Sequence, residues 1–268
     1  MSNKKSWIPL FLTLSNMGFG FLVIWIALTK QEAFFLDPSR FFRLVALFLI
    51  ISCVCDFLDG YIARKLKVSS GLGVELDSLA DLISFGIAPV VVFYVGFFDA
   101  KPSIFSFVAC LGYLLAGAFR LARFNNSAHQ KDAPSSHFQG LPITGASLMW
   151  IGFLLFLGLG MSDEFLLGHE AAFRRATIMI FASLGFLMVS HLPYRSLKTP
   201  LQKSVHFKRN LFLLGLFLIL LAIRVGPEAL LLAIPILYVF GTPAALIFKK
   251  IRSNKTDLKE SGELKPKN

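Results

Sequence analysis

The sequence predicts an all-α integral membrane protein, and three observations lead to this fold class. Of its 268 residues, 55% are hydrophobic, and the mean hydropathy is +0.67, which is far from the composition of soluble globular chains. Apolar segments of about 20 residues, the length that an α-helix needs to cross a bilayer, recur along the chain. The stretches between these segments are basic on one side of the predicted membrane and nearly neutral on the other.

We expect the apolar segments to form eight helices, of which the seventh is noticeably short. The first follows the polar residues Met1 to Lys5 without a small-residue cleavage site, and its apolar run exceeds a signal-peptide core. It is therefore predicted to remain as a membrane helix. The predicted spans are 8–28, 42–63, 74–97, 103–122, 141–161, 174–193, 210–224 and 228–248.

The charge distribution predicts how these helices are oriented. The terminal segments and the alternate loops on one side carry 20 of the 27 Lys and Arg residues. Because basic loops stay in the cytoplasm, we expect both termini there, in a multi-pass protein of the bacterial inner membrane. The same rule accounts for the net charge of +11 without nucleic acid as a partner. The Lys/Glu-rich tail at 253–268 has no apolar pattern and is predicted to be disordered.

Four aspartates are the most informative feature of the chain. Asp56 and Asp59 have i,i+3 spacing at the end of one apolar segment, and Asp77 and Asp81 have i,i+4 spacing at the start of the next. Each pair therefore places both carboxylates on one helix face. A charge at membrane depth costs about 2.5–3.5 kcal/mol on insertion scales, so these groups need compensation. Divalent cations prefer oxygen ligands, and the aspartates predict a metal site in the membrane.

The residues around the aspartates suit a phosphate-bearing substrate. Gly60 and Gly73 leave room for a helix or a headgroup to approach closely. Arg64 lies one turn beyond Gly60, where a guanidinium can bind phosphate oxygens, and Ser70 in the short connection could donate to the same oxygens. Carboxylates that hold a cation beside such an arginine are typical of a site for a diphosphate.

The spacing Asp56-x2-Asp59-Gly60-x2-Ala63-Arg64-x8-Gly73-x3-Asp77-x3-Asp81 resembles the signature of the CDP-alcohol phosphotransferase family at every fixed position. The resemblance implies a six-helix core, here at 1–193, and the remaining apolar segments predict an additional helix pair at 194–252. It also implies a homodimer that uses one or two Mg²⁺ or Mn²⁺ ions. Members of the family displace CMP from a CDP-linked lipid or alcohol with the hydroxyl group of an acceptor.

The resemblance also implies roles for individual residues. The first three aspartates would bind metal, and Asp81 would act as the general base and could also touch a metal ion. The diphosphate-bearing lipid would contact residues of the motif and of the first helix, where Leu10 departs from an Asn that is common in the family. The expected lipid-binding residues are Thr13, Asn16, Gly60, Arg64, Ser70 and Gly73.

Four further stretches resemble the members of the family that use L-serine, and they lie at 73–89, 117–125, 138–144 and 188–198. We therefore expect CDP-diacylglycerol and L-serine as substrates. Serine needs a cation for its carboxylate and acceptors for its ammonium group. The candidates near the motif are Arg120, Arg123, Asn125, Glu75 and Ser84. Membrane anchoring is an alternative role for the arginines, and a favourable first-turn charge is an alternative for Glu75.

Two other functions are compatible with parts of the pattern. A sister enzyme could use glycerol phosphate, inositol or choline, although a phosphorylated acceptor would demand a more basic pocket than Arg120 and Arg123 provide. A divalent-cation transporter could also place aspartates in the membrane. Against the transporter, all four aspartates are expected near one membrane face, and Arg64 would repel cations from their path.

Overall fold

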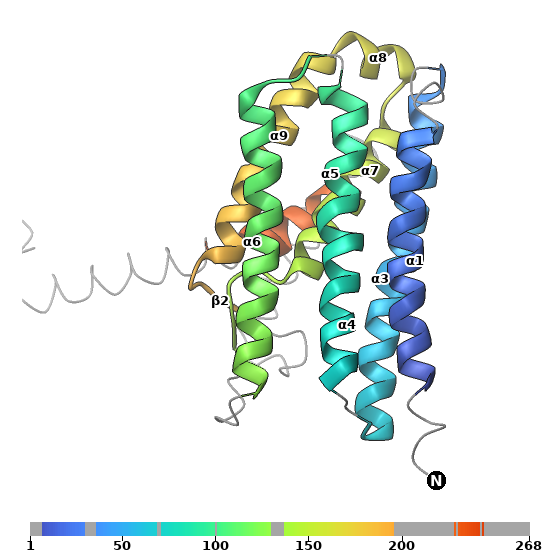
Figure 1. Cartoon of the computed structure of the whole chain (residues 1–268). Helices are drawn as coiled ribbons and strands as arrows, with labels where there is room; N and C mark the ends of the chain where they lie inside the picture. The colour runs from blue at the N-terminus through green and yellow to red at the C-terminus, as the bar shows by residue number, and fades with distance from the viewer. Residues whose placement is uncertain are drawn as a thin grey trace, which may run out of the picture.

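The computed structural model of the chain describes residues 7–29, 36–68, 71–99, 101–129, 137–195, 228, 230–241 and 243. Within these residues six helices are long and apolar enough to cross a membrane, and in Figure 1 they stand side by side in a bundle. Six of the predicted spans are thereby confirmed. Their bounds are Trp7–Thr29, Pro38–Leu66, Gly71–Phe98, Ile104–Asn126, Ile143–Gly160 and Glu170–Val189.

The spans map onto the labelled elements as follows. The first two are single helices, α1 (Trp7–Thr29) and α3 (Pro38–Leu66). The third is composite, and the last three lie in α6 (Ile104–His129), α7 (Ile143–Gly160) and α9 (Glu170–Val189). A short helix, α8 (Asp163–Gly168), connects α7 to α9. The helix α3 begins at Pro38, and the carboxylate of Asp37 accepts a hydrogen bond from the backbone N–H of Arg40 at 2.8 Å, which caps its first turn.

The third span is not a uniform α-helix. Its α-helical parts, α4 (Gly71–Asp81) and α5 (Ala88–Phe93), are followed by the π-helical segments η2 (Leu82–Ile87) and η3 (Tyr94–Phe98) respectively. Wide π turns are rare and occur mostly near functional sites. In η2 the carbonyl oxygen of Phe85 accepts a hydrogen bond from the hydroxyl of Tyr113 on α6 at 2.6 Å. The first π segment thus starts directly after Asp81 and is tied to a neighbouring helix.

Helix α1 packs against α3, α4 and η2, and one glycine permits its closest approach. An ideal Cβ placed on Gly20 would lie 2.6 Å from the Cα of Ser84 in η2. Real Cβ atoms do not come so close to a backbone atom, so an alanine would force the two elements apart. Small residues allow this backbone contact between membrane helices.

An aromatic cluster forms the centre of the bundle, between the third span and α7, α9 and α6. The ring of Phe93 lies 4.7 Å from that of Trp150 and 6.0 Å from that of Phe181. The rings of Trp150 and Phe181 are 4.2 Å apart, and the ring of Tyr113 lies 5.2 Å from that of Phe181. All four side chains are almost fully buried. Aromatic side chains contribute large buried areas and so dominate core packing.

The two strands β1 (His137–Gln139) and β2 (Pro193–Arg195) form a small antiparallel ribbon that the prediction of an all-α fold did not include. The ribbon joins the chain after α6 to the end of α9. The hydroxyl of the buried Tyr194 donates to the carbonyl oxygen of Val239 at 2.9 Å. Burial, and next the nearby Tyr238, raise the pKa of Tyr194 to about 12, so its hydroxyl remains a donor at neutral pH.

The C-terminal part of the described chain is a shorter apolar helix, Leu230–Gly241, which falls inside the predicted eighth span. It packs against α7, because an ideal Cβ on Gly152 would lie 2.7 Å from Pro235. The predicted seventh span at 210–224 and the predicted tail at 253–268 lie outside the described residues.

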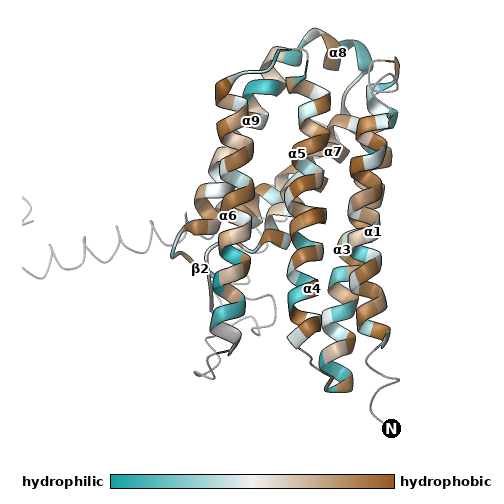
Figure 2. Ribbon diagram, in the orientation of Figure 1, coloured by the Kyte–Doolittle hydropathy of each residue, from teal (hydrophilic) through white to brown (hydrophobic). Residues whose placement is uncertain are grey.

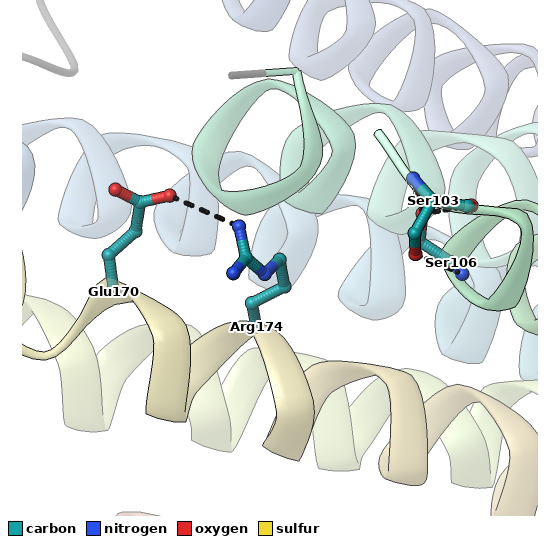
Figure 3. A network of polar contacts seen from close by, with 4 residues as sticks. All are labelled: Ser103, Ser106, Glu170 and Arg174. Atoms are coloured by element: carbon teal, nitrogen blue, oxygen red, sulfur yellow. Dashed lines mark hydrogen bonds and ion pairs between the residues drawn. The ribbon is translucent and has the colours of Figure 1, made fainter. Parts of the chain in front are cut away.

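The two ends of the bundle differ in polarity. Figure 2 shows hydrophilic residues gathered along the lower parts of α3, α4 and α6, whereas the middle parts of the helices are mostly hydrophobic. At the opposite end, polar contacts serve helix termini (Figure 3): Ser103 and Ser106 exchange hydrogen bonds between side chains and backbone N–H groups at 3.1 Å. This reciprocal arrangement caps α6. Glu170 and Arg174 form an i,i+4 ion pair at 3.8 Å in the first turns of α9.

Candidate metal centre

Three of the four motif aspartates, two on α3 and one on α4, converge at one place. Asp56, Asp59 and Asp77 each offer a carboxylate oxygen, and these three atoms lie within 4.8 Å of one another. Asp81 lies one turn further along the third span, is 5% exposed, and is in side-chain contact with Asp56. The spacing of the aspartates in the sequence therefore brings carboxylates of two helices together.

The three converging oxygens fit a small divalent cation. Octahedral ligands of Mg²⁺ at 2.0–2.1 Å are about 2.9 Å apart when adjacent and about 4.2 Å apart when opposite, so a bound ion would draw three oxygens that lie within 4.8 Å closer together. Carboxylates are also the ligand type that hard cations prefer. Asp56, Asp59 and Asp77 could accordingly hold a divalent metal, and the mutual repulsion of their charges would be relieved by it.

Helix α1 supplies a further contact that orients this cluster. The hydroxyl of Thr13 donates a hydrogen bond to Oδ2 of Asp59 at 2.7 Å, and both side chains are buried. A partner that holds one oxygen of a carboxylate leaves the other oriented toward the metal, as residues behind metal ligands commonly do. Thr13 thus links the first span to the metal centre.

A cavity of about 570 Å³ opens beside the aspartates and is walled by α1, α3 and α4. An ideal Cβ on Gly60 would lie 3.2 Å from Nη1 of Arg64, so the guanidinium folds back over the glycine at the cavity wall. The cavity combines carboxylates, a guanidinium and apolar surface, as an amphipathic diphosphate would require. The predicted residues that line it are Thr13, Asp59, Gly60, Arg64, Gly73 and Asp77.

Among the residues predicted to bind the lipid substrate, Asn16 is not part of the cavity lining. Asn16 is fully buried behind the cavity, and its amide nitrogen lies 3.4 Å from Oδ1 of Asp81. Ser70 lies outside the described residues. The wall of the cavity is thus formed by most of the predicted set, with Asn16 in contact with a carboxylate instead.

Apart from Arg123, the acceptor candidates divide into two groups, of which the first lies at the site. Arg120 is 9% exposed, interacts electrostatically with Asp81 and Asp56, and stands 5.5 Å from the ring of Phe124. Ser84 is fully buried and donates to the carbonyl oxygen of Asn16 at 2.9 Å. Arg120 is therefore a buried cation whose charge acts on the predicted general base.

The second group forms polar contacts between α4 and α6. The amide nitrogen of Asn125 donates to Glu75 at 3.3 Å and to Ser78 at 3.0 Å. Asn125 is buried. The cluster joins an acidic group of α4 to an amide of α6, five residues after Arg120.

Arg123 has a structural partner. Its guanidinium donates to the carbonyl oxygens of Met188 and Val189 at 3.4 Å, which are the last carbonyls of α9. Such contacts satisfy acceptors that a helix end leaves free. Gly140, at a φ of +81°, passes beside this guanidinium, and an ideal Cβ there would lie 2.9 Å from Nη2. Arg123 stabilises the junction of α6, α9 and the ribbon.

Sequence reasoning missed two polar residues near the site. Ser52 on α3 is fully buried and donates to Asn16, and its position one turn before Asp56 was the available signal. Tyr238 lies on the C-terminal helix, where its ring packs against Gly145 and interacts electrostatically with Arg120. No local pattern connects Tyr238 to the motif, because the contact depends on how the C-terminal helix docks.

The fold and the site together define a polytopic membrane protein with a cluster of carboxylates, a candidate metal centre, beside an amphipathic cavity. Comparison with known families gives a more specific assignment: the family model described as CDP-alcohol phosphatidyltransferase matches residues 6–242. The chain belongs to this family, and the resemblance noted in the sequence is confirmed.

Curated relatives narrow the comparison further. A CDP-diacylglycerol–serine O-phosphatidyltransferase of Helicobacter pylori is 32% identical over 235 residues, covering 87% of this chain and 88% of the relative. Proteins with the same name from Mycobacterium leprae and Saccharomyces cerevisiae are 28% and 35% identical over 242 and 170 residues. The M. leprae match covers 89% of this chain and 74% of the relative, and the yeast match covers 57% and 56%.

Proposed function

We propose that this protein transfers the phosphatidyl group from CDP-diacylglycerol to the hydroxyl of L-serine and releases CMP. The observation that carries the proposal is the carboxylate cluster beside the 570 Å³ cavity. It is supported by the H. pylori relative, which is called a CDP-diacylglycerol–serine O-phosphatidyltransferase and matches this chain over most of both lengths. The reaction forms one P–O bond from the serine oxygen to the lipid-side phosphorus and breaks the P–O bond to CMP.

The lipid substrate would lie in the cavity with its diphosphate at the polar end. Arg64 would bind the phosphate oxygens, and Gly60 and Gly73 would leave room for the headgroup to approach closely. Thr13 would hold Asp59 in place. Asp56, Asp59 and Asp77, with Asp81 as a possible fourth ligand, would hold one or two Mg²⁺ or Mn²⁺ ions. Bound metal would neutralise the diphosphate and the leaving CMP.

Asp81 would accept the proton of the serine hydroxyl as that oxygen attacks the phosphorus. It is buried, contacts Asp56 and interacts electrostatically with the cationic Arg120, which could bind the serine carboxylate. The acceptors of Glu75, Asn125 and Ser78 lie close enough together to receive the ammonium group. General-base assistance is typically worth about 10²–10⁴ in rate.

Release of CMP from CDP-diacylglycerol by the purified protein tests this function. We expect release to require both L-serine and Mg²⁺ or Mn²⁺, and to stop in chelator. Asp81→Asn should abolish turnover and leave binding of the nucleotide lipid measurable. Near-normal rates in that variant would refute the role of Asp81, and preference for labelled glycerol phosphate, inositol or choline would assign another acceptor.

The orientation and the assembly of the protein belong to the same proposal. We expect the aspartate-bearing ends of α3 and α4 to face the cytoplasm of a bacterium, because the basic loops lie on that side. We also expect a homodimer, as the family resemblance implies. Reporter fusions at either terminus test the orientation, and native mass spectrometry in detergent tests the assembly.

A further inference from the structure

A chain of buried hydrogen bonds leads from α3 through α1 to the third span and ends on Asp81. Asn16 is at its centre, and its amide nitrogen faces Oδ1 of Asp81 at 3.4 Å. The hydroxyl of Ser52 contacts both oxygens of Asn16: it lies 3.1 Å from the backbone carbonyl and closer still to Oδ1. Ser84 donates to the same backbone carbonyl at 2.9 Å.

We propose that Ser52 is a positioning residue that fixes the side-chain amide of Asn16 so that its nitrogen faces Asp81 and holds this carboxylate in place. The inference rests on the proposed function, in which Asp81 takes the proton of the serine hydroxyl. Neither Ser52 nor Asn16 is among the residues that line the cavity. Both would act through the orientation of Asp81.

The chemistry of the amide explains why Ser52 matters. An asparagine side chain has an accepting oxygen on one side and a donating nitrogen on the other, and a half turn exchanges them. A hydroxyl that donates to Oδ1 selects one of the two orientations. Without it, Asn16 could turn its oxygen toward Asp81, where two acceptors would face each other. The bond from Ser52 thus determines which group Asp81 meets.

The surroundings keep this chain in one geometry. Ser52, Asn16 and Ser84 are fully buried, so water does not compete for their hydrogen bonds. Gly20 lies one turn after Asn16 on α1 and allows the backbone contact with Ser84. The wide turn of η2 begins directly after Asp81 and contains Ser84. Three elements therefore meet at a single asparagine.

Packing alone does not require these groups. Membrane helices can pack through apolar residues without side-chain hydrogen bonds between them, and such bonds are individually weak. Polar side chains in this environment are costly and usually serve a function. Here the chain ends on the carboxylate that the proposed reaction uses, which favours a role in turnover over a role in folding.

A double-mutant cycle of Ser52→Ala and Asn16→Ala tests the proposal on the full-length enzyme in lipid nanodiscs. We expect Ser52→Ala to lower kcat for CMP release about three- to tenfold, the range for loss of one hydrogen bond. Asn16→Ala should lower kcat about 10–100-fold, as for residues behind a functional carboxylate. The double variant should be no slower than Asn16→Ala, because Ser52 acts through Asn16.

The Michaelis constants and the binding of CDP-diacylglycerol distinguish positioning from substrate contact. Both should stay within about twofold of wild type in Ser52→Ala, since neither Ser52 nor Asn16 lines the cavity. Ser147→Ala is the matched control: this serine of α7 is equally buried, and its hydroxyl bonds the carbonyl oxygen of Thr144 in its own helix. Its kcat should be unchanged.

Three outcomes would overturn the inference: effects of Ser52→Ala and Asn16→Ala that multiply, a change confined to KM, or an unchanged kcat in Ser52→Ala. If Ser52→Ala fails to fold, Ser52→Cys keeps a similar volume with a weak donor and is read in the same way. Release of CMP by wild-type enzyme in the presence of L-serine is recorded in the same assay. Its absence would refute the proposed function, independently of the cycle.

Discussion

The carboxylate end of the bundle and its aromatic centre are both buried, but different forces hold them. At the carboxylate end, α1, α3 and α4 are joined by hydrogen bonds such as that of Thr13 to Asp59, and like charges lie within 4.8 Å. In the centre, Phe93, Trp150 and Phe181 are joined by ring packing. The comparison suggests that activity depends on the first region and stability on the second, so that mutations should separate the two properties.

Removal of a carboxylate from the metal cluster should have the largest effect. We expect Asp77→Asn to lower CMP release about 10³-fold or more, because a bound metal supplies several kcal/mol of transition-state stabilisation. The melting temperature should not fall, since the substitution removes one of several repelling charges. Activity assays and thermal unfolding in detergent measure both quantities.

Asp99→Asn is the control for this prediction, because Asp99 is an exposed carboxylate directly after the same span. It should change neither quantity. A large loss of stability in Asp77→Asn would contradict the separation of the two regions.

The converse test removes a ring from the aromatic centre. Phe181→Ala should destabilise the protein by about 3–5 kcal/mol, the cost of a large cavity in a packed core. The kcat per folded molecule should remain close to wild type, because Phe181 lies away from the aspartates. Denaturant titration and active-site-normalised assays check the two parts.

Phe186→Ala serves as the comparison on the same helix, since Phe186 is 73% exposed and borders an apolar groove. We expect a much smaller loss of stability there. Equal losses in the two variants would show that ring packing in the centre is not the main source of stability.

Gly20 connects the two properties, because it controls the contact of α1 with η2. Gly20→Ala should cost about 1–3 kcal/mol of stability, the usual cost of overpacking, and should also lower kcat because Ser84 and Asn16 are displaced. Gly18→Ala is the matched control, since an ideal Cβ at Gly18 meets no atom within 4 Å. Measurements of kcat and of the free energy of unfolding for both variants provide the test. Equal values for Gly20→Ala and Gly18→Ala would contradict the expected role of the contact between α1 and η2.

The smallest effect is expected at the end of the bundle opposite the aspartates. Ser103→Ala removes one half of the reciprocal cap of α6 and should cost about 1 kcal/mol, without a change in kcat. Ser183→Ala, in which the lost hydroxyl only bonds carbonyl oxygens of its own helix, should cost less. Thermal unfolding compares the two, and a fall in kcat for Ser103→Ala would contradict the expectation.

The sequence was sufficient for the features that depend on local spacing. Apolar segments of membrane length predicted six spans, and the i,i+3 and i,i+4 spacings predicted that Asp56, Asp59 and Asp77 share one site. Thr13 was found through the resemblance, and its contact with Asp59 agrees with a place at the site. In each case a single helix face or one helix pair determines the outcome.

Features that depend on three or more elements could not be predicted from the sequence. The bond of Arg123 to the end of α9 requires the ribbon and α9 to be in place. The docking of Tyr238 near Arg120 depends on the C-terminal helix. The π turns of the third span left no local signal, since Leu82 to Ile87 reads as an ordinary apolar helix.

The two π segments have a consequence for how this span tolerates changes in length. A π turn accommodates one more residue than an α turn, so losing a residue there can convert it to a regular turn without rotating the flanking faces. Insertions or deletions elsewhere in the span would turn Asp77 and Phe93 away from their partners. Natural or engineered changes in the length of this helix are therefore expected at 82–87 and 94–98. A change there would leave both the carboxylates and the rings facing their partners.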